Sequence, residues 1–282
     1  LSDHLPRSRK YNPKQRLWYI RAKEVIISSG SIERPIVFGN NDTPGVVLAS
    51  AAREYLKVYG VLVGKRPLVF TNNDSAYETA IEFKKNGILP IVLDSRVNPD
   101  SEIISEAKNM GIEIKFSHVV VATKGYKKVK SAKIAKISED KKNLTKIENI
   151  NCDCICVSGF WTPTIHLASQ SGNKTIFNKD IDAFVPGKSK QKETTLGSAN
   201  GIFTLEETLK TSFDAGNKIS KKFTNKENKI SVPQVSEKKH TKHDKFWCVP
   251  LPKGKFYKRF LDFQNDVSVS DVELALREGY RS

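Results

Sequence analysis

Two short turns rich in small residues carry the clearest chemical signal in the sequence. Residues 28–30 (Ser-Ser-Gly) follow an apolar run, and residues 197–201 (Gly-Ser-Ala-Asn-Gly) precede a helical pattern. Small residues let a backbone approach a phosphate closely, and the free amides of a helix N-terminus attract its charge. Either turn alone indicates only a tight bend. With a strand-helix-strand pattern between them, the two turns predict the two ends of one dinucleotide site.

A second candidate lies at residues 71–74, where Asn72, Asn73 and Asp74 follow a short apolar strand pattern. The turn lacks the spaced glycines that let a backbone approach a pyrophosphate, and the negative charge of Asp74 would repel an anion. The free amides at the start of the next helix could still bind an anion. Asp94 ends the next strand pattern, where an acid could bind the ribose of a nucleotide. Two interpretations stay open: a nucleotide site with Asn72, Asn73 and Asp94, or a structural unit that has lost binding.

The remaining reactive side chains give weaker signals. His166 has no identifiable carboxylate partner in the sequence, so a packing or interface histidine is favoured over a catalytic base. Cys152, Cys154 and Cys156 alternate along a strand pattern, which predicts that all three lie on one face. A flat strand spreads their sulfur atoms about 7 Å apart, which disfavours a metal site and favours buried apolar cysteines in a reducing compartment. The sequence therefore offers no convincing catalytic triad, metal cluster or phosphate loop.

Length and charge limit the classes of protein that fit. The chain has 282 residues, 38% of them apolar, enough for one large or two ordinary domains with a buried core. The formal charge of +16 comes from two segments: residues 124–146 carry nine Lys against two acids, and residues 218–259 carry thirteen Lys or Arg against three. Most are Lys rather than Arg, which indicates solvated surface rather than nucleic-acid recognition. No transmembrane run or signal peptide is recognisable, so we expect a cytoplasmic protein with neither nucleic acid nor membrane as partner.

Hydrophobic periodicity predicts alternating strands and helices around these turns. Helices are expected at 46–59, 75–86 (capped by Asp74 or Ser75), 101–110, 204–215 (closed by Gly216) and 271–279. Strands are expected at 67–70, 89–94, 112–116 and 152–158, with a three-stranded meander at 119–123, 127–129 and 132–137 and a polar return at 138–150. The predicted fold class is α/β, a Rossmann-like flavoprotein fold with two dinucleotide-binding domains.

These elements predict a domain plan. Residues 1–60 would form the C-terminal part of a first dinucleotide-binding domain, 61–160 a second, inserted Rossmann-like domain with the meander, and 161–217 a return to the first. Residues 218–245 would form a mobile Lys-rich linker, and 246–282 the lead-in to a further domain. The chain begins with Leu1 and has no glycine-rich strand-to-helix turn before Val25, so we expect a fold truncated at both ends within a larger subunit.

Several strings of residues resemble the alpha-subunit family of heterotetrameric sarcosine oxidase, in the same order along nearly the whole chain. The most specific are Thr-Asn-Asn-Asp at 71–74 and Asp-Phe-Gln-Asn-Asp-Val at 262–267. Others lie at 32–38, 41–46, 157–167 and 183–187. The resemblance implies that the chain is the middle of such a subunit, with a tetrahydrofolate-binding domain following residues 246–282.

The resemblance further implies a complex of four different subunits that demethylates sarcosine to glycine with oxygen, releasing H2O2 and passing the one-carbon unit to tetrahydrofolate. Amine oxidation would occur at FAD in the beta subunit, covalent FMN would lie between alpha and beta, and gamma and delta subunits would complete the complex. The alpha subunit would hold NAD, lined here by Ser29, Gly30, Asn200 and Gly201. The family's first turn is usually Ala-Thr-Gly, where this chain has Ser-Ser-Gly. No catalytic residue is expected in this chain.

Two other classes of function fit the same elements. The alpha subunit of an opine or amino-acid dehydrogenase would share the nucleotide folds but end without a folate domain, whereas the string at 262–267 leads toward that domain and favours sarcosine oxidase. A non-catalytic assembly module would keep vestigial nucleotide folds without a cofactor. Retention of a bound dinucleotide distinguishes the assembly module from the enzyme subunits.

Overall fold

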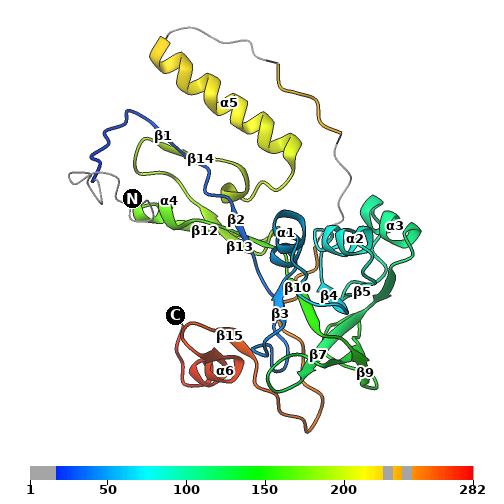
Figure 1. The fold of residues 1–282 in the computed structure, drawn as a ribbon. Coiled ribbons are helices and arrows are strands. Elements are labelled where there is room, and N and C mark those ends of the chain that lie inside the picture. Colours follow the sequence, from blue (N-terminus) through cyan, green and yellow to red (C-terminus); the bar gives the residue numbers. More distant parts are fainter. Residues whose placement is uncertain (1–16, 225–230, 237–242, 282) are drawn as a thin grey trace, which may run out of the picture.

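The largest sheet among the described residues is parallel and five-stranded, and it lies on the right-hand side of Figure 1. The computed structural model describes residues 17–224, 231–236 and 243–281. In sheet order the strands are β3 (Val46–Leu48), β10 (Cys154–Ser158), β4 (Pro67–Thr71), β5 (Ile91–Asp94) and β6 (Glu113–Phe116). Helices α1 (Ala49–Tyr59), α2 (Tyr77–Lys85) and α3 (Glu102–Asn109) connect them. We call these elements, with the meander described below, the sheet unit.

Burial on both faces explains why the central strands are almost continuously apolar. All five residues of β4 are buried, and alternate side chains point to opposite faces. Leu68 and Phe70 belong to one apolar cluster with the meander, whereas Val69 belongs to another with the helices. The five-stranded sheet is therefore the shared wall of two cores, and both cores fix the position of its carboxyl edge.

A three-stranded antiparallel meander covers one face of this sheet. Its strands are β7 (His118–Lys124), β8 (Ser131–Lys136) and β9 (Glu148–Asn151). The strand predicted at 127–129 is wrong, because these residues lie in the connection between β7 and β8. The third strand lies instead in the segment predicted as a polar return. Three of the four β9 residues are exposed, so the strand lacks the alternation that reveals strands in a sequence.

Two helix boundaries differ from the prediction for reasons visible in the packing. The helix predicted from residue 46 begins only at Ala49, because the three residues before it pair with β10 as β3. Neither Asp74 nor Ser75 caps α2, which has no side-chain cap. The Asp74 carboxylate instead lies 2.8 Å from the Arg96 guanidinium.

Glycine ends one predicted helix but not another. Gly60 closes α1 in the left-handed conformation, with φ of +64°, and its amide donates to the Leu56 carbonyl. Gly216 does not close the helix predicted at 204–215, which continues through it as α5 (Leu205–Thr224). A glycine inside a helix costs only about 1 kcal/mol relative to alanine, so it is a weak stop signal.

A second group of elements, which we call the outer unit, lies beside the sheet unit (Figure 1). It consists of β1 (Val25–Ile27) parallel to β14 (Glu193–Thr195), β2 (Ser31–Glu33) antiparallel to β11 (Trp161–Pro163), the hairpin β12 (Thr175–Asn178) and β13 (Ala183–Pro186), the helix α4 (His166–Gln170), the short 3₁₀ turn η1 (Gly197–Asn200) and α5. Residues 34–45 carry the chain from β2 into the sheet unit, and residues 159–160 carry it back to β11. We call these two connections the crossovers.

The last described residues form a small third group with β15 (Phe260–Asp262), β16 (Val267–Ser268) and α6 (Val269–Arg277). Ser268 and Asp271 form a reciprocal capping box at the start of α6. The Asn41 side-chain amide donates to the Phe260 carbonyl at 2.8 Å, and its oxygen accepts from the Phe260 amide at 2.9 Å. These paired bonds attach the group to the first crossover.

Part of the predicted plan falls outside these observations. Residues 1–16, and residues 225–230 and 237–242 of the predicted linker, lie outside the described residues, whereas 218–224 are helical. The domain boundaries stay predictions, although β3 and α1, which precede the boundary at residue 60, pack within the sheet unit. None of the helices in the described ranges is both long and apolar enough to cross a membrane.

Candidate functional site

Both small-residue turns leave the same edge of one parallel strand pair. In the β1–β14 pair Ile27 lies opposite Thr195, and the Leu196 amide donates to the Ile27 carbonyl at 2.9 Å. Residues 28–30 follow β1 directly, and residues 197–201 follow β14 after one residue. The carboxyl edge of parallel strands is where α/β sheets bind nucleotides. The pairing thus brings together the turns that the sequence singles out.

The first turn is open and braced from one side. Gly30 has φ of +76°, a conformation that favours glycine, and a Cβ atom built on it would meet nothing within 4 Å. The Ser29 hydroxyl donates to the Thr164 carbonyl at 2.7 Å, and the Thr164 amide donates to the Gly30 carbonyl at 3.0 Å. The buried Thr164 hydroxyl has no hydrogen-bond partner among the described residues. The turn therefore presents an unobstructed backbone beside a hydroxyl that is still able to bond.

The second turn is tighter. Gly201 ends η1 in the left-handed conformation, with φ of +77°. A Cβ atom on Gly201 would lie 2.9 Å from Ile181 Cδ1 and 3.0 Å from Val185 Cγ1, so only glycine fits without movement. Asn200 is exposed beside it. The helix expected to open at this turn begins only at Leu205 and carries acids in its first turn, so amides of the turn itself are the donors that could face a phosphate.

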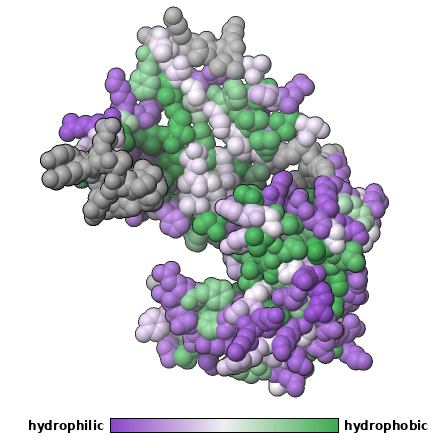
Figure 2. All heavy atoms as spheres, viewed as in Figure 1, coloured by the Kyte–Doolittle hydropathy of each residue, from purple (hydrophilic) through white to green (hydrophobic). Residues whose placement is uncertain are grey.

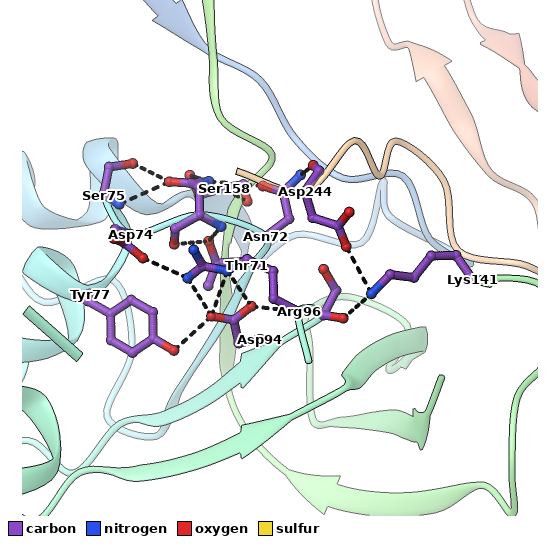
Figure 3. A network of polar contacts seen from close by, with 12 residues as sticks. Thr71, Asn72, Asp74, Ser75, Tyr77, Asp94, Arg96, Lys141, Ser158 and Asp244 are labelled. Atoms are coloured by element: carbon purple, nitrogen blue, oxygen red, sulfur yellow. Dashed lines mark hydrogen bonds and ion pairs between the residues drawn. The ribbon is translucent and has the colours of Figure 1, made fainter. Parts of the chain in front are cut away.

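Asn72 is buried within a polar network at the carboxyl edge of the five-stranded sheet (Figure 3), and the neighbouring Asn73 is buried as well. The Asn73 side-chain amide donates to the Ser158 hydroxyl at 3.1 Å, and its oxygen accepts from the Ser75 amide at 3.0 Å. The Asn72 amide donates to the Asp244 carbonyl at 2.7 Å. These amides therefore connect β4, β10 and a later segment of the chain, and their role in binding a nucleotide stays a prediction.

Asp94 is fully buried, and other side chains engage its carboxylate (Figure 3). Arg96 donates to both of its oxygens, at 2.7 Å from Nη2 and 3.0 Å from Nε, and the Tyr77 hydroxyl donates at 2.8 Å. Burial and the adjacent Asp94 charge raise the pKa of Tyr77, so the hydroxyl stays protonated as a donor. The predicted ribose contact of Asp94 stays a prediction, and the arrangement seen here is that of a buried structural acid.

Residues that the sequence analysis missed complete this network. Arg96 also forms an ion pair with Asp74. Burial lowers the pKa of Arg96, but its hydrogen bonds to Asp94 and Asp74 and the negative charges of these two acids outweigh that effect and raise the pKa. Lys141 donates to the Ser95 carbonyl and forms an ion pair of 2.9 Å with Asp244. The Asp-x-Arg spacing at the end of β5 is the one sequence signal that could have revealed this cluster.

The weaker candidates, His166 and the cysteines, have separate surroundings. His166 is exposed at the start of α4. The prediction that three cysteines share one face is wrong, because Cys152 precedes β10 and packs with the meander, whereas Cys154 and Cys156 pack with the helices. Burial raises the pKa of Cys152 to about 12. The ranges that the structure describes contain no group of three or more metal-binding side chains.

An apolar cavity of about 440 Å³ lies between the first crossover and the C-terminal group. Ile36, Phe38, Leu48 and Phe263 line it, and Asp42 supplies a carboxylate. Figure 2 shows the C-terminal group set apart from the outer unit by an open hollow. Since a dinucleotide carries an anionic pyrophosphate, a cavity with an acid and no cationic lining suits it less well than the two turns.

Comparison with known sequences shows relatives along nearly the whole chain. The chain is 33% identical over 275 residues to sarcosine oxidase subunit alpha of Corynebacterium sp. (strain P-1), and 32% identical over 283 residues to that of Rhizobium meliloti (strain 1021). These alignments cover 95% and 99% of the chain but only 28% and 27% of the relatives. The family model for the sarcosine oxidase A3 domain matches residues 256–282.

Solved structures show the same fold at low sequence identity. L-proline dehydrogenase from P. horikoshii superposes with a TM-score of 0.56 at 20% identity, covering 92% of this chain and 46% of that one. Thioredoxin reductase from T. acidophilum gives a TM-score of 0.50 at 16% identity, covering 64% of this chain and 59% of that one. These likenesses confirm the predicted Rossmann-like flavoprotein fold class.

Proposed function

Because this chain belongs to the family of sarcosine oxidase alpha subunits over the segment that it shares with them, we propose that it forms the dinucleotide-binding part of such a subunit. The dinucleotide is NAD. The enzyme is a multisubunit oxidoreductase that demethylates sarcosine to glycine, releases H2O2 and passes the one-carbon unit to tetrahydrofolate. FAD and covalent FMN belong to the complex with the beta, gamma and delta subunits, and amine oxidation occurs outside this chain.

The observation that carries this proposal is the position of the two turns at one carboxyl edge. The Leu196–Ile27 hydrogen bond and the pairing of β1 with β14 hold residues 28–30 and 197–201 side by side. A site that binds both phosphates of one dinucleotide requires such an arrangement. Gly30 and Gly201 both adopt left-handed conformations that favour glycine. At Gly30, where nothing lies within 4 Å of the position of a Cβ atom, the lack of a side chain leaves the backbone open to close approach.

The residues present fit such a group. Backbone amides of η1 and the exposed Asn200 side chain would bind phosphate oxygens, and the Thr164 hydroxyl would gain the partner that it lacks among the described residues. Ser29 would hold the first turn in position through Thr164. NAD, when bound, supplies a nicotinamide able to accept or donate a hydride. Asn72, Asn73 and Asp94 would position the sheet unit rather than bind the cofactor.

The domain plan follows from the same proposal. Residues 161–217 complete the NAD domain begun by residues 1–60, and residues 61–160 form the inserted domain, with which β3 and α1 of the first range pack. The match of residues 256–282 to the A3 domain supports the view that 246–282 lead toward a folate-binding domain.

The test uses the full-length alpha subunit co-expressed with its genomic neighbours. The purified complex is denatured, the released cofactors are identified by mass spectrometry, and peroxide is assayed with sarcosine. We expect NAD together with flavins and sarcosine-dependent peroxide. Asn200→Ala should lower the amount of NAD retained, whereas Asn109→Ala, at the exposed end of α3, should not.

Two other outcomes would overturn the proposal in different ways. Flavin without NAD, with activity only on another amine or amino acid, would assign the chain to an opine or amino-acid dehydrogenase. A stable complex that retains no dinucleotide in this subunit would make the chain an assembly module.

A further inference from the structure

The segment 243–249, which we call the clasp, contacts both units where the crossovers meet. It follows a stretch of chain outside the described residues, and its Asp244 lies at the carboxyl edge of the five-stranded sheet, beside Asn72 (Figure 3). The Asp244 amide donates to the Asn72 carbonyl at 3.0 Å, and the Asn72 side chain returns a bond of 2.7 Å to the Asp244 carbonyl. The Asp244 carboxylate pairs with Lys141. Phe246 is buried in the core shared with the meander.

The other end of the clasp reaches the outer unit. The Trp247 ring stacks over the Arg34 guanidinium, whose carbon lies 3.8 Å from the ring centroid. The Trp247 indole N–H donates to the Asp182 carboxylate, and Arg34 Nη1 donates to the Asp182 carbonyl at 2.9 Å. Asp182 directly precedes β13. Burial lowers the pKa of Arg34 to about 10, with the Asp182 charge opposing that change.

The clasp also binds the first crossover along its backbone. The Val37 amide donates to the Trp247 carbonyl, and the Val249 amide donates to the Val37 carbonyl, both at 2.8 Å. Val37 and Cys248 thereby form a parallel bridge. The first crossover is thus hydrogen-bonded to the clasp in the manner of a short sheet.

The second crossover is held in an unfavourable conformation between aromatic rings. Phe160 has φ of +82°, which costs on the order of 1–3 kcal/mol for a bulky residue. Its ring stacks on His243 with centroids 3.9 Å apart and packs edge-on against Phe203. Its carbonyl accepts from the Arg34 amide at 2.9 Å, which ties the two crossovers together.

Two units joined by two crossovers are free to change orientation unless a large apolar interface holds them. Here the two units are also joined directly by individual side-chain hydrogen bonds, such as those from the Ser50 hydroxyl to the Glu33 carboxylate and from the Trp161 indole to the Ser75 hydroxyl. From the clasp contacts we propose that residues 243–249 lock the outer unit and the sheet unit in one relative orientation. Releasing Trp247 from Arg34 and Asp182 frees rotation about the crossovers.

The experiment measures the distance between the two units by pulsed electron spin resonance on the full-length subunit. Spin labels are placed at Lys179→Cys, next to β12, and at Asn109→Cys, both of which are exposed. Every sample, the reference included, carries Cys248→Ser, which keeps the clasp backbone, and serine in place of exposed cysteines elsewhere in the full-length subunit; Cys152, Cys154 and Cys156 are buried. The protein with an intact clasp should give one narrow distance peak, and Trp247→Ala should lose that peak in favour of a broad distribution. Phe256→Ala, another aromatic truncation in the same part of the chain but exposed, should retain it.

Two further variants keep the outcome decisive. Trp247→Phe keeps a ring over Arg34 and loses only the donor to Asp182, so it should broaden the distribution less and should fold if Trp247→Ala does not. Asp244→Ala releases the clasp from Lys141 and should broaden the distribution as well. If Trp247→Phe and Asp244→Ala, folded as judged by circular dichroism, both keep the narrow peak, the clasp does not lock the units.

Discussion

Two buried acids illustrate how surroundings decide what a carboxylate does. Asp94 faces Arg96 and Tyr77, which satisfy its oxygens with donors. Glu33, at the end of β2, accepts from the Ser50 amide at 2.8 Å and from its hydroxyl at 2.6 Å, although the helix α1 that Ser50 belongs to has no side-chain cap of its own. Glu33 thus acts as a remote cap for α1. Burial raises the pKa of Glu33, and its hydrogen bonds only partly offset that effect.

The raised pKa of Glu33 predicts a measurable dependence of stability on pH. A carboxyl group with a higher pKa in the folded state binds more protons when folded, so its contribution to stability is fully present below its ordinary value of 4.5 and is lost as pH rises through the folded pKa. Glu33→Gln cannot ionise. The free energy of unfolding of the wild type minus that of Glu33→Gln should therefore fall as pH increases over this window.

Urea unfolding of both proteins across a pH series measures this difference. Glu54→Gln, an exposed acid on α1, is the matched control and should show a much smaller change. Parallel stability curves for the wild type and Glu33→Gln would show that Glu33 does not titrate differently on folding.

At the scale of elements, the β1–β14 pair and its turns are built from short segments that the rest of the outer unit supports. Each strand has only three residues. The first turn depends on Thr164 through two hydrogen bonds, whereas the second depends on the packing of Ile181 and Val185 against Gly201. The two glycines should therefore respond differently to an added methyl group.

Gly201→Ala should destabilise the protein more than Gly30→Ala. Both substitutions put an L side chain at positive φ, at a cost of about 1 kcal/mol. Only Gly201→Ala adds contacts of 2.9 and 3.0 Å to neighbouring side chains, so it should lose stability beyond that amount. Urea unfolding of the two variants measures this. Equal losses would mean that the neighbours of Gly201 yield freely.

At the scale of the whole molecule, the carboxyl edges of the outer unit and the sheet unit have different surroundings. The first turn of the outer unit is open, whereas the clasp lies over the carboxyl edge of the sheet unit, with Asn72 fully buried beneath it. The clasp occupies the part of this sheet edge beside Asn72, where a second dinucleotide would have to bind. The positive charge also follows the fold, since most lysines of residues 124–146 are exposed on the meander and its loops.

We therefore predict one dinucleotide per alpha subunit, held by the outer unit. Equilibrium dialysis with NAD should give a stoichiometry near one for the wild type and for Asn72→Ala. Asn72→Ala should lose on the order of 1–3 kcal/mol of stability, because the buried clasp carbonyls lose their donor. A stoichiometry of two in the wild type, reduced by Asn72→Ala, would show instead that the sheet unit binds nucleotide.

Local signals were sufficient to predict many elements of this chain. Strands such as β4 are recognisable from the sequence because burial on both faces makes them continuously apolar, and α1 because its apolar residues recur at helical spacing and Gly60 ends it. Local signals fail to predict β9, whose residues are mostly exposed, and the end of α5, which continues through Gly216.

By itself, the sequence determined the fold class, the family and the two small-residue turns, because these depend on residue type and on spacing along the chain. Only the tertiary structure decided which residues that are far apart in the sequence contact one another. It brought residues 28–30 beside 197–201, paired Asp94 with Arg96, and laid the clasp over Asn72 and Arg34. The physical reason is that a buried polar group must find its partner in space, and nothing in the order of residues states which distant partner it will find.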